Sequence, residues 1–165
     1  MKRIILLSDT HGYIDERILA YCESSDEIWH AGDIGTLAVA DALEKTKKTF
    51  RAVYGNIDGQ EIRIRYPKIN RFRCEDVDVL LTHIAGRPEN YLPEIKTLVE
   101  ENPPKLVVCG HSHILLVKFE KKYNLLHLNP GAAGKSGFHQ KRTLLQFTIA
   151  GKEIKDLQVI ELGNR

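Results

Sequence analysis

The amino-acid sequence predicts an α/β fold built from layers of helix and mixed β-sheet. Apolar runs alternate with helical patterns through the first two-thirds of the 165 residues, as in folds with strands and crossover helices. The last third contains consecutive strand patterns joined by tight turns, which predict antiparallel hairpins. No internal repeat, low-complexity segment or long linker divides the chain, so we expect a single domain over residues 1–165.

The first predicted elements alternate between strand and helix. Apolar runs predict strands at residues 3–7, 27–31 and 49–54. Apolar residues spaced on one helical face predict helices at residues 14–23 and 37–47. This alternation, followed by strands alone, favours mixed sheets over purely antiparallel ones.

The later predicted elements are mainly strands. A hairpin is expected from residues 71–74 and 77–82, joined by Glu75-Asp76. A helix at residues 94–101 ends at Asn102-Pro103-Pro104, because a residue before proline avoids the helical conformation. The remaining predicted strands are residues 105–109, a hairpin of 115–120 with 125–128, and a hairpin of 143–149 with 154–160.

Composition excludes some classes of protein without naming a function. The chain is 42% hydrophobic and 28% charged, as in ordinary globular proteins, and its net charge of +2 gives no strong nucleic-acid signal. No apolar run approaches the roughly 20 residues that cross a bilayer, so no membrane partner is expected. The apolar run after Lys2 and Arg3 is too short for a signal peptide. Three cysteines without metal-type spacing predict free thiols and a cytoplasmic location. A homo-oligomer is left open.

Five polar clusters each follow an apolar strand pattern. They are Asp9-Thr10-His11, Gly32-Asp33, Gly55-Asn56, His83 and Gly110-His111-Ser112-His113. Because ligands in open α/β sheets collect beyond the carboxyl ends of the strands, we expect the strands of one sheet to bring all five clusters to one edge. The pooled candidate metal ligands are Asp9, His11, Asp33, Asn56, His83, His111 and His113.

This set of imidazole, carboxylate and amide groups is typical of a metal site. Seven ligands are more than one octahedral ion needs, and the set lacks the thiolates of structural zinc sites. It suits two ions about 3.5–4 Å apart, bridged by one carboxylate. Each cluster alone is weak evidence: Asp9 by itself is more often a helix cap. Five clusters at five strand ends favour the metal interpretation.

The ordered series of motifs resembles the calcineurin-like metallophosphoesterase superfamily, and most of all its small bacterial and archaeal phosphodiesterase branch. The resemblance runs from residue 4 to about residue 131 and includes Asn129-Pro130-Gly131. It implies a four-layer αββα sandwich with two central mixed β-sheets flanked by helices. It also implies how the ligands divide. Asp9, His11 and His113 would hold one metal, Asn56, His83 and His111 the second, and Asp33 would bridge them.

The function implied by the resemblance is hydrolysis of a small or nucleotide-like phosphodiester by a metal-bridging hydroxide. The residues expected to act in catalysis are His11, Asp33 and Asn56. Two divalent transition-metal ions are the expected cofactors, with Mn²⁺ first and Fe, Zn²⁺, Co²⁺ or Ni²⁺ also compatible with mixed nitrogen and oxygen ligands. The alternative is a non-catalytic metal-binding scaffold or protein-interaction module. A DNA nuclease would need further domains and a longer basic surface.

The sequence departs from the family pattern at Ile57. Many members have a histidine directly after the Gly-Asn pair, where it can protonate the leaving group, but here Ile57 follows Gly55-Asn56. An isoleucine side chain cannot donate a proton, so His11 or a metal-bound water would have to act as the acid. We therefore expect phosphodiesters with good leaving groups to be hydrolysed best, with weaker phosphomonoesterase activity.

The remaining polar residues receive structural interpretations. His30 is expected to be a hydrogen-bonded core histidine, with orientation of the bridging carboxylate or of a ligand as the alternative, and His127 is expected to be structural. His139 is expected to lie in a solvated loop, with a mobile loop near the site as the alternative. Asp58 is balanced between a helix N-cap and a functional role. A basic run is expected on the exposed face of an edge strand. It comprises Arg63, Arg65, Lys68, Arg71 and Arg73.

Overall fold

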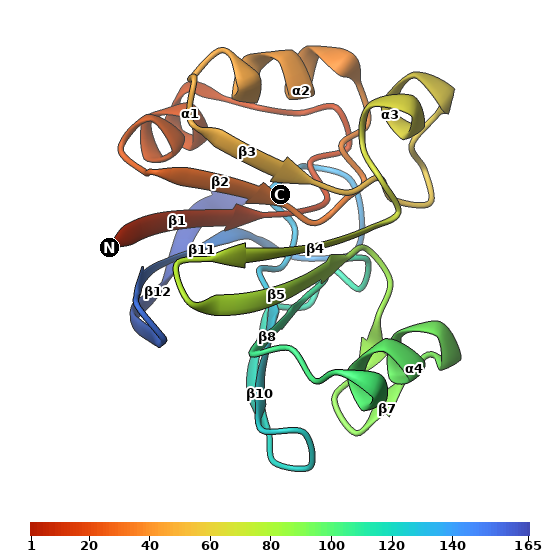
Figure 1. Ribbon diagram of the computed structural model, residues 1–165. Helices are drawn as coiled ribbons and strands as arrows, with labels where there is room; N and C mark the ends of the chain where they lie inside the picture. Colours follow the sequence, from red (N-terminus) through yellow and green to blue (C-terminus); the bar gives the residue numbers. More distant parts are fainter.

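The computed structural model describes residues 1–165 and contains two five-stranded mixed sheets (Figure 1). The first sheet has the order β12-β11-β1-β2-β3 and the second the order β4-β5-β8-β10-β9. The strands of the first are β1 (Lys2–Leu7), β2 (Glu27–His30), β3 (Thr49–Ala52), β11 (Lys141–Ala150) and β12 (Glu153–Asn164). Those of the second are β4 (Ile69–Cys74), β5 (Val77–Thr82), β8 (Leu106–Val108), β9 (Leu116–Glu120) and β10 (Leu125–Asn129).

Three adjacent strands run parallel in each sheet. In the first sheet β1, β2 and β3 are parallel to one another, and β11 pairs antiparallel with β1. In the second sheet β5, β8 and β10 are parallel, with β4 and β9 antiparallel at the two edges. A two-stranded ribbon of β6 (Gly86–Arg87) and β7 (Asn90–Tyr91) stands apart from both sheets.

Alternate side chains of the strands pack into different layers. Ile4 and Leu6 of β1 face the second sheet and share a core with its buried strand residues. Ile5 and Leu7 point the other way, against the apolar faces of α1 (Glu16–Glu23) and α2 (Leu37–Glu44). This period of two follows from the pleat of a strand, and it buries β1 on both faces.

The outer face of the second sheet is covered by a single helix. Leu80 of β5 and Val107 of β8 pack with Ile95 and Val99 of α4 (Pro93–Glu101). Helices α1, α2 and the short α3 (Gln60–Arg65) lie on one outer side and α4 on the other (Figure 1). The molecule is therefore layered helix, sheet, sheet, helix, which confirms the predicted αββα sandwich. None of the four helices is both long and apolar enough to cross a lipid bilayer.

The prediction that one sheet gathers all five polar clusters is wrong. Three of the clusters follow strands β1, β2 and β3 of the first sheet, whereas His83 and the cluster starting at Gly110 follow β5 and β8 of the second. Apolar runs predict strands but not which strands pair, because pairing depends on contacts distant in sequence. The two sheets instead bring their carboxyl ends together.

Several predicted elements differ from the structure in extent. Helix α1 begins at Glu16 rather than residue 14, because Asp15 is its N-cap and accepts a hydrogen bond from the Ile18 N–H at 2.9 Å. Helix α3 and the ribbon β6–β7 were not predicted, since they are too short to show a periodic pattern. The basic run does not lie on one strand: Arg63 and Arg65 belong to α3, whereas Arg71 and Arg73 lie on the edge strand β4.

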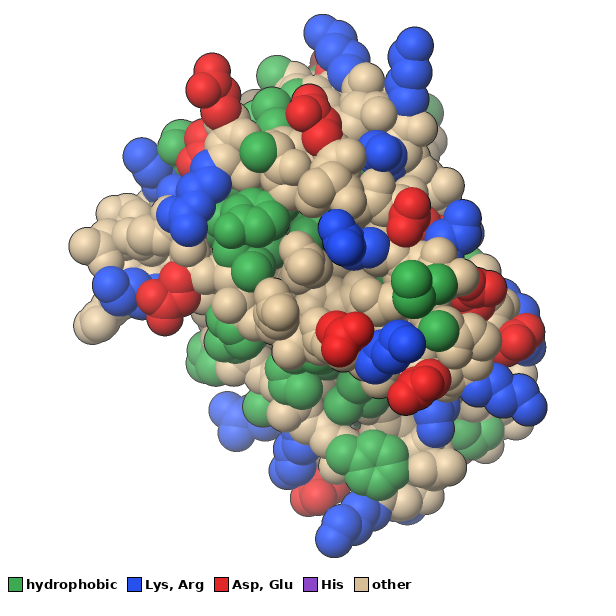
Figure 2. All heavy atoms as spheres, turned by 90° about the vertical axis from the view of Figure 1, so that its left-hand side faces the viewer, with side chains coloured by type: hydrophobic (Ala, Val, Ile, Leu, Met, Phe, Trp, Pro, Cys, Tyr) green, Lys and Arg blue, Asp and Glu red, His purple; other side chains and the backbone are tan.

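The two ends of the sandwich differ in their surface chemistry. The face at the amino ends of β1 and β2 carries interspersed acidic and basic side chains, and no histidine is visible on it (Figure 2). The loops at the opposite ends of these strands carry Asp9, His11 and Asp33. The side chains suited to metal binding or catalysis thus lie at the carboxyl ends of these strands.

Candidate metal centre

The site lies where the carboxyl ends of the two sheets meet. Within the first sheet, the Asp9 N–H donates to the Gly32 carbonyl at 3.0 Å and joins the loops after β1 and β2. Within the second, the Gly110 N–H donates to the His83 carbonyl at 3.0 Å. The two sheets are joined directly by the His111 N–H, which donates to Asp9 Oδ2 at 3.1 Å. Loops from both sheets therefore form one rigid cluster.

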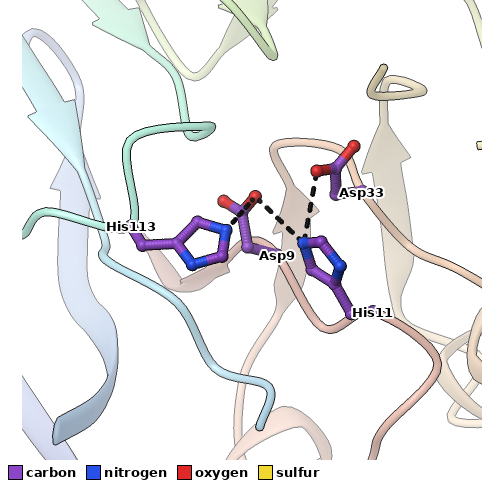
Figure 3. Close-up of side chains that lie close together, drawn as sticks. All are labelled: Asp9, His11, Asp33 and His113. Carbon is purple, nitrogen blue, oxygen red and sulfur yellow. Dashed lines mark ion pairs between the residues drawn. The ribbon is translucent and has the colours of Figure 1, made fainter. Parts of the chain in front are cut away.

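The first group of side chains consists of Asp9, His11, Asp33 and His113, whose potential ligand atoms all lie within 4.8 Å of one another (Figure 3). His113 Nε2 lies 3.1 Å from Asp9 Oδ1. His11 Nε2 lies 3.2 Å from Asp33 Oδ2 and 3.7 Å from Asp9 Oδ1. Burial alone would raise the pKa of Asp9, but the neighbouring imidazoles of His11 and His113 outweigh it and hold that pKa below its usual range.

Two atoms of this group are buried without a hydrogen-bond partner, Asp9 Oδ1 and His11 Nε2. The other oxygen of Asp9 is satisfied, since Oδ2 accepts from Ser8 Oγ at 2.7 Å and from the His111 N–H. A buried polar atom with no partner is costly, and a cation among these ligands would remove the cost. Carboxylate oxygen and imidazole nitrogen suit a divalent transition metal. The residues therefore fit a metal ion here.

The second group consists of Asn56, His83 and His111. Asn56 Oδ1 lies 3.0 Å from His83 Nε2 and 3.0 Å from His111 Nδ1. His83 Nδ1 donates to the Ala31 carbonyl at 2.7 Å, so in a neutral ring Nε2 carries the lone pair that can bind a metal. The same Nε2 lies 3.2 Å from Asp33 Oδ1. Three potential ligand atoms converge beside Asp33, as a second metal position requires.

The backbone is strained at five of the seven predicted ligands. Residues with positive φ include Asp9 (54°), His11 (46°), Asp33 (55°), His111 (72°) and His113 (61°). Such conformations are uncommon for residues other than glycine and cluster at functional sites. Here the strain aims side chains from sharp turns at strand ends into a shared space. A sequence pattern carries no signal for it.

Asp58 supports the site instead of capping a helix. Its carboxylate accepts hydrogen bonds from the backbone N–H groups of Ile34 (3.1 Å), Gly35 (2.8 Å) and Gly55 (2.7 Å). The N-cap of α3 is Gly59, and no side chain caps that helix, so the N-cap interpretation of Asp58 is wrong. Asp58 clamps the loop after Asp33 to the loop that carries Asn56. The close packing of these loops also explains Gly55, where a Cβ would collide with the Asp33 carboxylate.

His30 and His127 are buried, hydrogen-bonded histidines, as predicted. His30 Nδ1 accepts from the Gly32 N–H at 3.1 Å, and its Nε2 lies 3.0 Å from Thr10 Oγ1. His127 Nδ1 lies 2.9 Å from the Tyr91 hydroxyl. Burial lowers the pKa of each ring to about 4, so both rings are neutral at pH 7. His30 braces the two turns that carry the first group of ligands.

His139 and Ile57 both lie next to predicted metal ligands. The segment around His139 is a loop with mostly exposed residues, as predicted, but its ring also contacts a predicted ligand, since its Nδ1 lies 3.2 Å from Nδ1 of His113. The 26 residues that separate the two rings leave no local signal of this contact. The Ile57 side chain is 48% exposed, and the residue contributes a backbone N–H, which donates to Asp33 Oδ1 at 3.1 Å. Its side chain provides no proton donor, as expected.

Two proteins are similar to this chain in sequence, and a solved structure is similar to it in fold. A probable metallophosphoesterase of Mycoplasma pneumoniae is 30% identical over 138 residues, which cover 80% of this chain and 79% of that protein. A phosphodiesterase of Methanocaldococcus jannaschii is 26% identical over 144 residues, covering 78% of this chain and 82% of its own. The structure of Vps29 from Entamoeba histolytica in complex with Zn²⁺ superimposes with a TM-score of 0.74 at 14% identity, covering 97% of this chain and 98% of that one. This last likeness concerns the fold alone.

A family model matches nearly the whole sequence. The model of the calcineurin-like phosphoesterase superfamily domain aligns with residues 1–152, which include all seven predicted ligands. The chain therefore belongs to the calcineurin-like phosphoesterase superfamily.

Proposed function

We propose that this protein is a phosphodiesterase that works with two divalent metal ions. Asp9, His11 and His113 hold one ion, Asn56, His83 and His111 hold the other, and Asp33 binds both. The observation that carries the proposal is the position of Asp33 between the two groups. Its Oδ2 lies 3.2 Å from His11 Nε2 and its Oδ1 lies 3.2 Å from His83 Nε2. A single carboxylate so placed is suited to bridge a metal pair.

The side chains have distinct roles in this proposal. When bound, two adjacent divalent ions, with Mn²⁺ the first to test, supply a water of lowered pKa and neutralise phosphoryl charge. Asp33 sets the spacing of the two half-sites. The Asn56 amide nitrogen makes no hydrogen bond within the protein and is available to a phosphoryl oxygen. Because Ile57 cannot supply a proton, His11 is the imidazole we assign to assist the leaving group.

A diester is favoured over a monoester by two cavities beside the second group. One, of about 260 Å³, is lined by Asn56, His83 and Arg63 among others. The other, of about 470 Å³, is lined by His111, Arg87 and Lys118 among others. Ile84 lines both cavities, so they adjoin one another across its side chain. A phosphodiester has two ester groups, and each cavity offers one of them a place, with basic side chains favouring anionic substituents.

The test compares an activated aryl phosphodiester with aryl and alkyl phosphomonoesters, with Mn²⁺ and with EDTA. We expect metal-dependent release that is fastest from the aryl diester, and loss of at least about a hundredfold in Asp33→Asn. Asp156→Asn is a matched control, because Asp156 is exposed and has no side-chain partner. Faster turnover of the alkyl monoester would overturn the diester assignment.

A second candidate, a metal-binding interaction module without turnover, is favoured by two observations. The fold is shared with Vps29, a structure of which contains Zn²⁺, and Ile57 removes one source of acid catalysis. Full occupancy by metal with no release from any phosphoester would support this alternative. The seven retained ligand residues favour the enzyme.

A further inference from the structure

The loop from Gly134 to Gln140 is fixed beside the first group of ligands. At its start, the Gly134 N–H donates to the Asp9 carbonyl at 3.1 Å. At its end, the Gln140 carbonyl accepts from the Arg165 N–H at 3.0 Å, and the Arg165 guanidinium donates to the Gly137 carbonyl. The loop is thus tied both to the turn after β1 and to Arg165. His139 lies within this fixed segment.

The hydrogen bonds of His139 determine which of its nitrogens carries the proton. His139 Nε2 lies 2.8 Å from the Gly134 carbonyl oxygen. A carbonyl only accepts hydrogen bonds, so Nε2 is the protonated nitrogen. In the neutral ring, Nδ1 is then an acceptor. The backbone of the loop therefore fixes His139 as an acceptor on the side that faces the metal ligands.

The acceptor at His139 Nδ1 favours one of the two protonation patterns of the His113 ring. The two Nδ1 atoms are 3.2 Å apart, and the rings meet edge to face with centroids 5.1 Å apart. Since His139 Nδ1 accepts, a hydrogen bond between the two rings requires His113 Nδ1 to donate and so to carry the proton of the neutral ring. His113 Nε2 is then left with its lone pair, 3.1 Å from Asp9 Oδ1. A cation bound between His113 Nε2 and Asp9 Oδ1 would remove the repulsion between these two unprotonated atoms.

We propose that His139 is a positioning residue that locks His113 in the Nδ1–H tautomer and so presents Nε2 to the first metal. The inference rests on the ligand role assigned to His113 above. The equivalent lock on His83 is a backbone carbonyl, that of Ala31. The first half-site instead depends on a side chain, that of His139, in the loop that is hydrogen-bonded to Arg165.

Gly137 gives independent support for the closeness of this contact. Its φ is +132°, and a Cβ at this position would collide with the His113 ring and lie 3.2 Å from His139 Nδ1. A side chain at position 137 would therefore force the two rings apart. The absence of a side chain at Gly137 allows the two imidazoles to lie in contact.

Two substitutions of His139 test separately the acceptor at Nδ1, which faces His113, and the donor at Nε2, which faces Gly134. Asn places its Oδ1 near the position of histidine Nδ1, so His139→Asn keeps an acceptor for His113. Gln places its polar end near the position of Nε2, so His139→Gln keeps the bond to Gly134 and loses the acceptor. Phe138→Ala is the matched control, because Phe138 is fully exposed in the same loop.

The first readout is the tautomer of His113 in the metal-free protein at pH 8, from long-range ¹H–¹⁵N NMR. We expect the Nδ1–H form in the wild type, in Phe138→Ala and in His139→Asn, and a mixture with the Nε2–H form in His139→Gln. The second readout is Mn²⁺ binding by calorimetry, where His139→Gln should weaken one of two sites by about 10–100-fold and His139→Asn by much less.

A wild-type tautomer and wild-type affinity in His139→Gln would overturn the proposal. So would equal losses in His139→Asn and His139→Gln, because they would indicate a merely structural role. The tautomer is measured without metal and without substrate. If the wild type binds metal but shows no hydrolysis, the proposed function fails while the result for His139 still stands; if it binds no metal, both fail.

Discussion

His11 lies between the two carboxylates of the site, and its side chain is partly exposed. We assign it two roles, metal ligand through Nε2 and donor to the leaving group through Nδ1–H, and saturating metal separates the two in one variant. His11→Ala should weaken metal binding and also lower kcat by about a hundredfold when metal is saturating, more for alkyl than for aryl leaving groups. The measurement is kcat against Mn²⁺ concentration.

The comparison variant for His11 is His113→Ala, which removes a ligand and no assigned acid. Its loss should be largely recovered by excess Mn²⁺ and should not depend on the leaving group. Full recovery of His11→Ala at saturating metal would contradict the second role of His11 and leave it a ligand only.

Position 57 allows a gain of activity. The Ile57 side chain is half exposed, and the bond to Asp33 comes from the backbone, so a new side chain here keeps that bond. Ile57→His should raise turnover of alkyl phosphoesters at least about tenfold and change aryl diesters little, because only poor leaving groups need a proton. Ile57→Leu is the control. Equal acceleration of both substrate types would argue against acid catalysis as the missing function.

At the scale of elements, Asp58 holds the loops after β2 and β3 together. Asp58→Ala leaves three backbone N–H groups without their acceptor and should lower the free energy of unfolding by about 3 kcal/mol. Asp58→Asn keeps one acceptor oxygen and should lose about half as much. Urea denaturation in EDTA measures both variants, with Asp156→Asn as the control. Wild-type stability in Asp58→Ala would mean that the clamp is not needed for folding.

The limits of sequence analysis are clearest at these same loops. Strand ends and their polar clusters could be predicted, because apolar runs and the residues next to them are local features. The clamp of Asp58 and the contact of His139 could not, since each joins residues about 25 positions apart, with no periodic pattern. The division of the clusters between two sheets was missed for the same reason. The convergence of the seven candidate ligands could be predicted, because motif order does not depend on strand pairing.

At the scale of the whole molecule, two buried histidines make folding sensitive to acid. Burial lowers the pKa of His30 and His127 to about 4 from 6.5. Between these values the unfolded chain binds protons that the folded chain does not. The free energy of unfolding therefore falls as the pH drops below about 6.5, by up to about 1.4 kcal/mol per pH unit for each ring.

Urea denaturation of the EDTA-treated protein from pH 7 to pH 5 tests this pH dependence. His127→Gln removes one of the two rings and should flatten the slope by up to about 1.4 kcal/mol per pH unit. His127 is the ring to replace, because His30 touches the turns that carry the ligands. An unchanged slope in His127→Gln would show that this ring is protonated equally in both states.

Loops from two sheets are proposed to hold a pair of metal ions that drive phosphodiester hydrolysis. The most direct test is to titrate the EDTA-treated protein with Mn²⁺ and to record bound metal and release from an aryl phosphodiester together. We expect no release without metal, and activity that rises to a plateau as the second ion per chain is bound. A plateau at one ion per chain, or two bound ions without any release, would contradict this proposal.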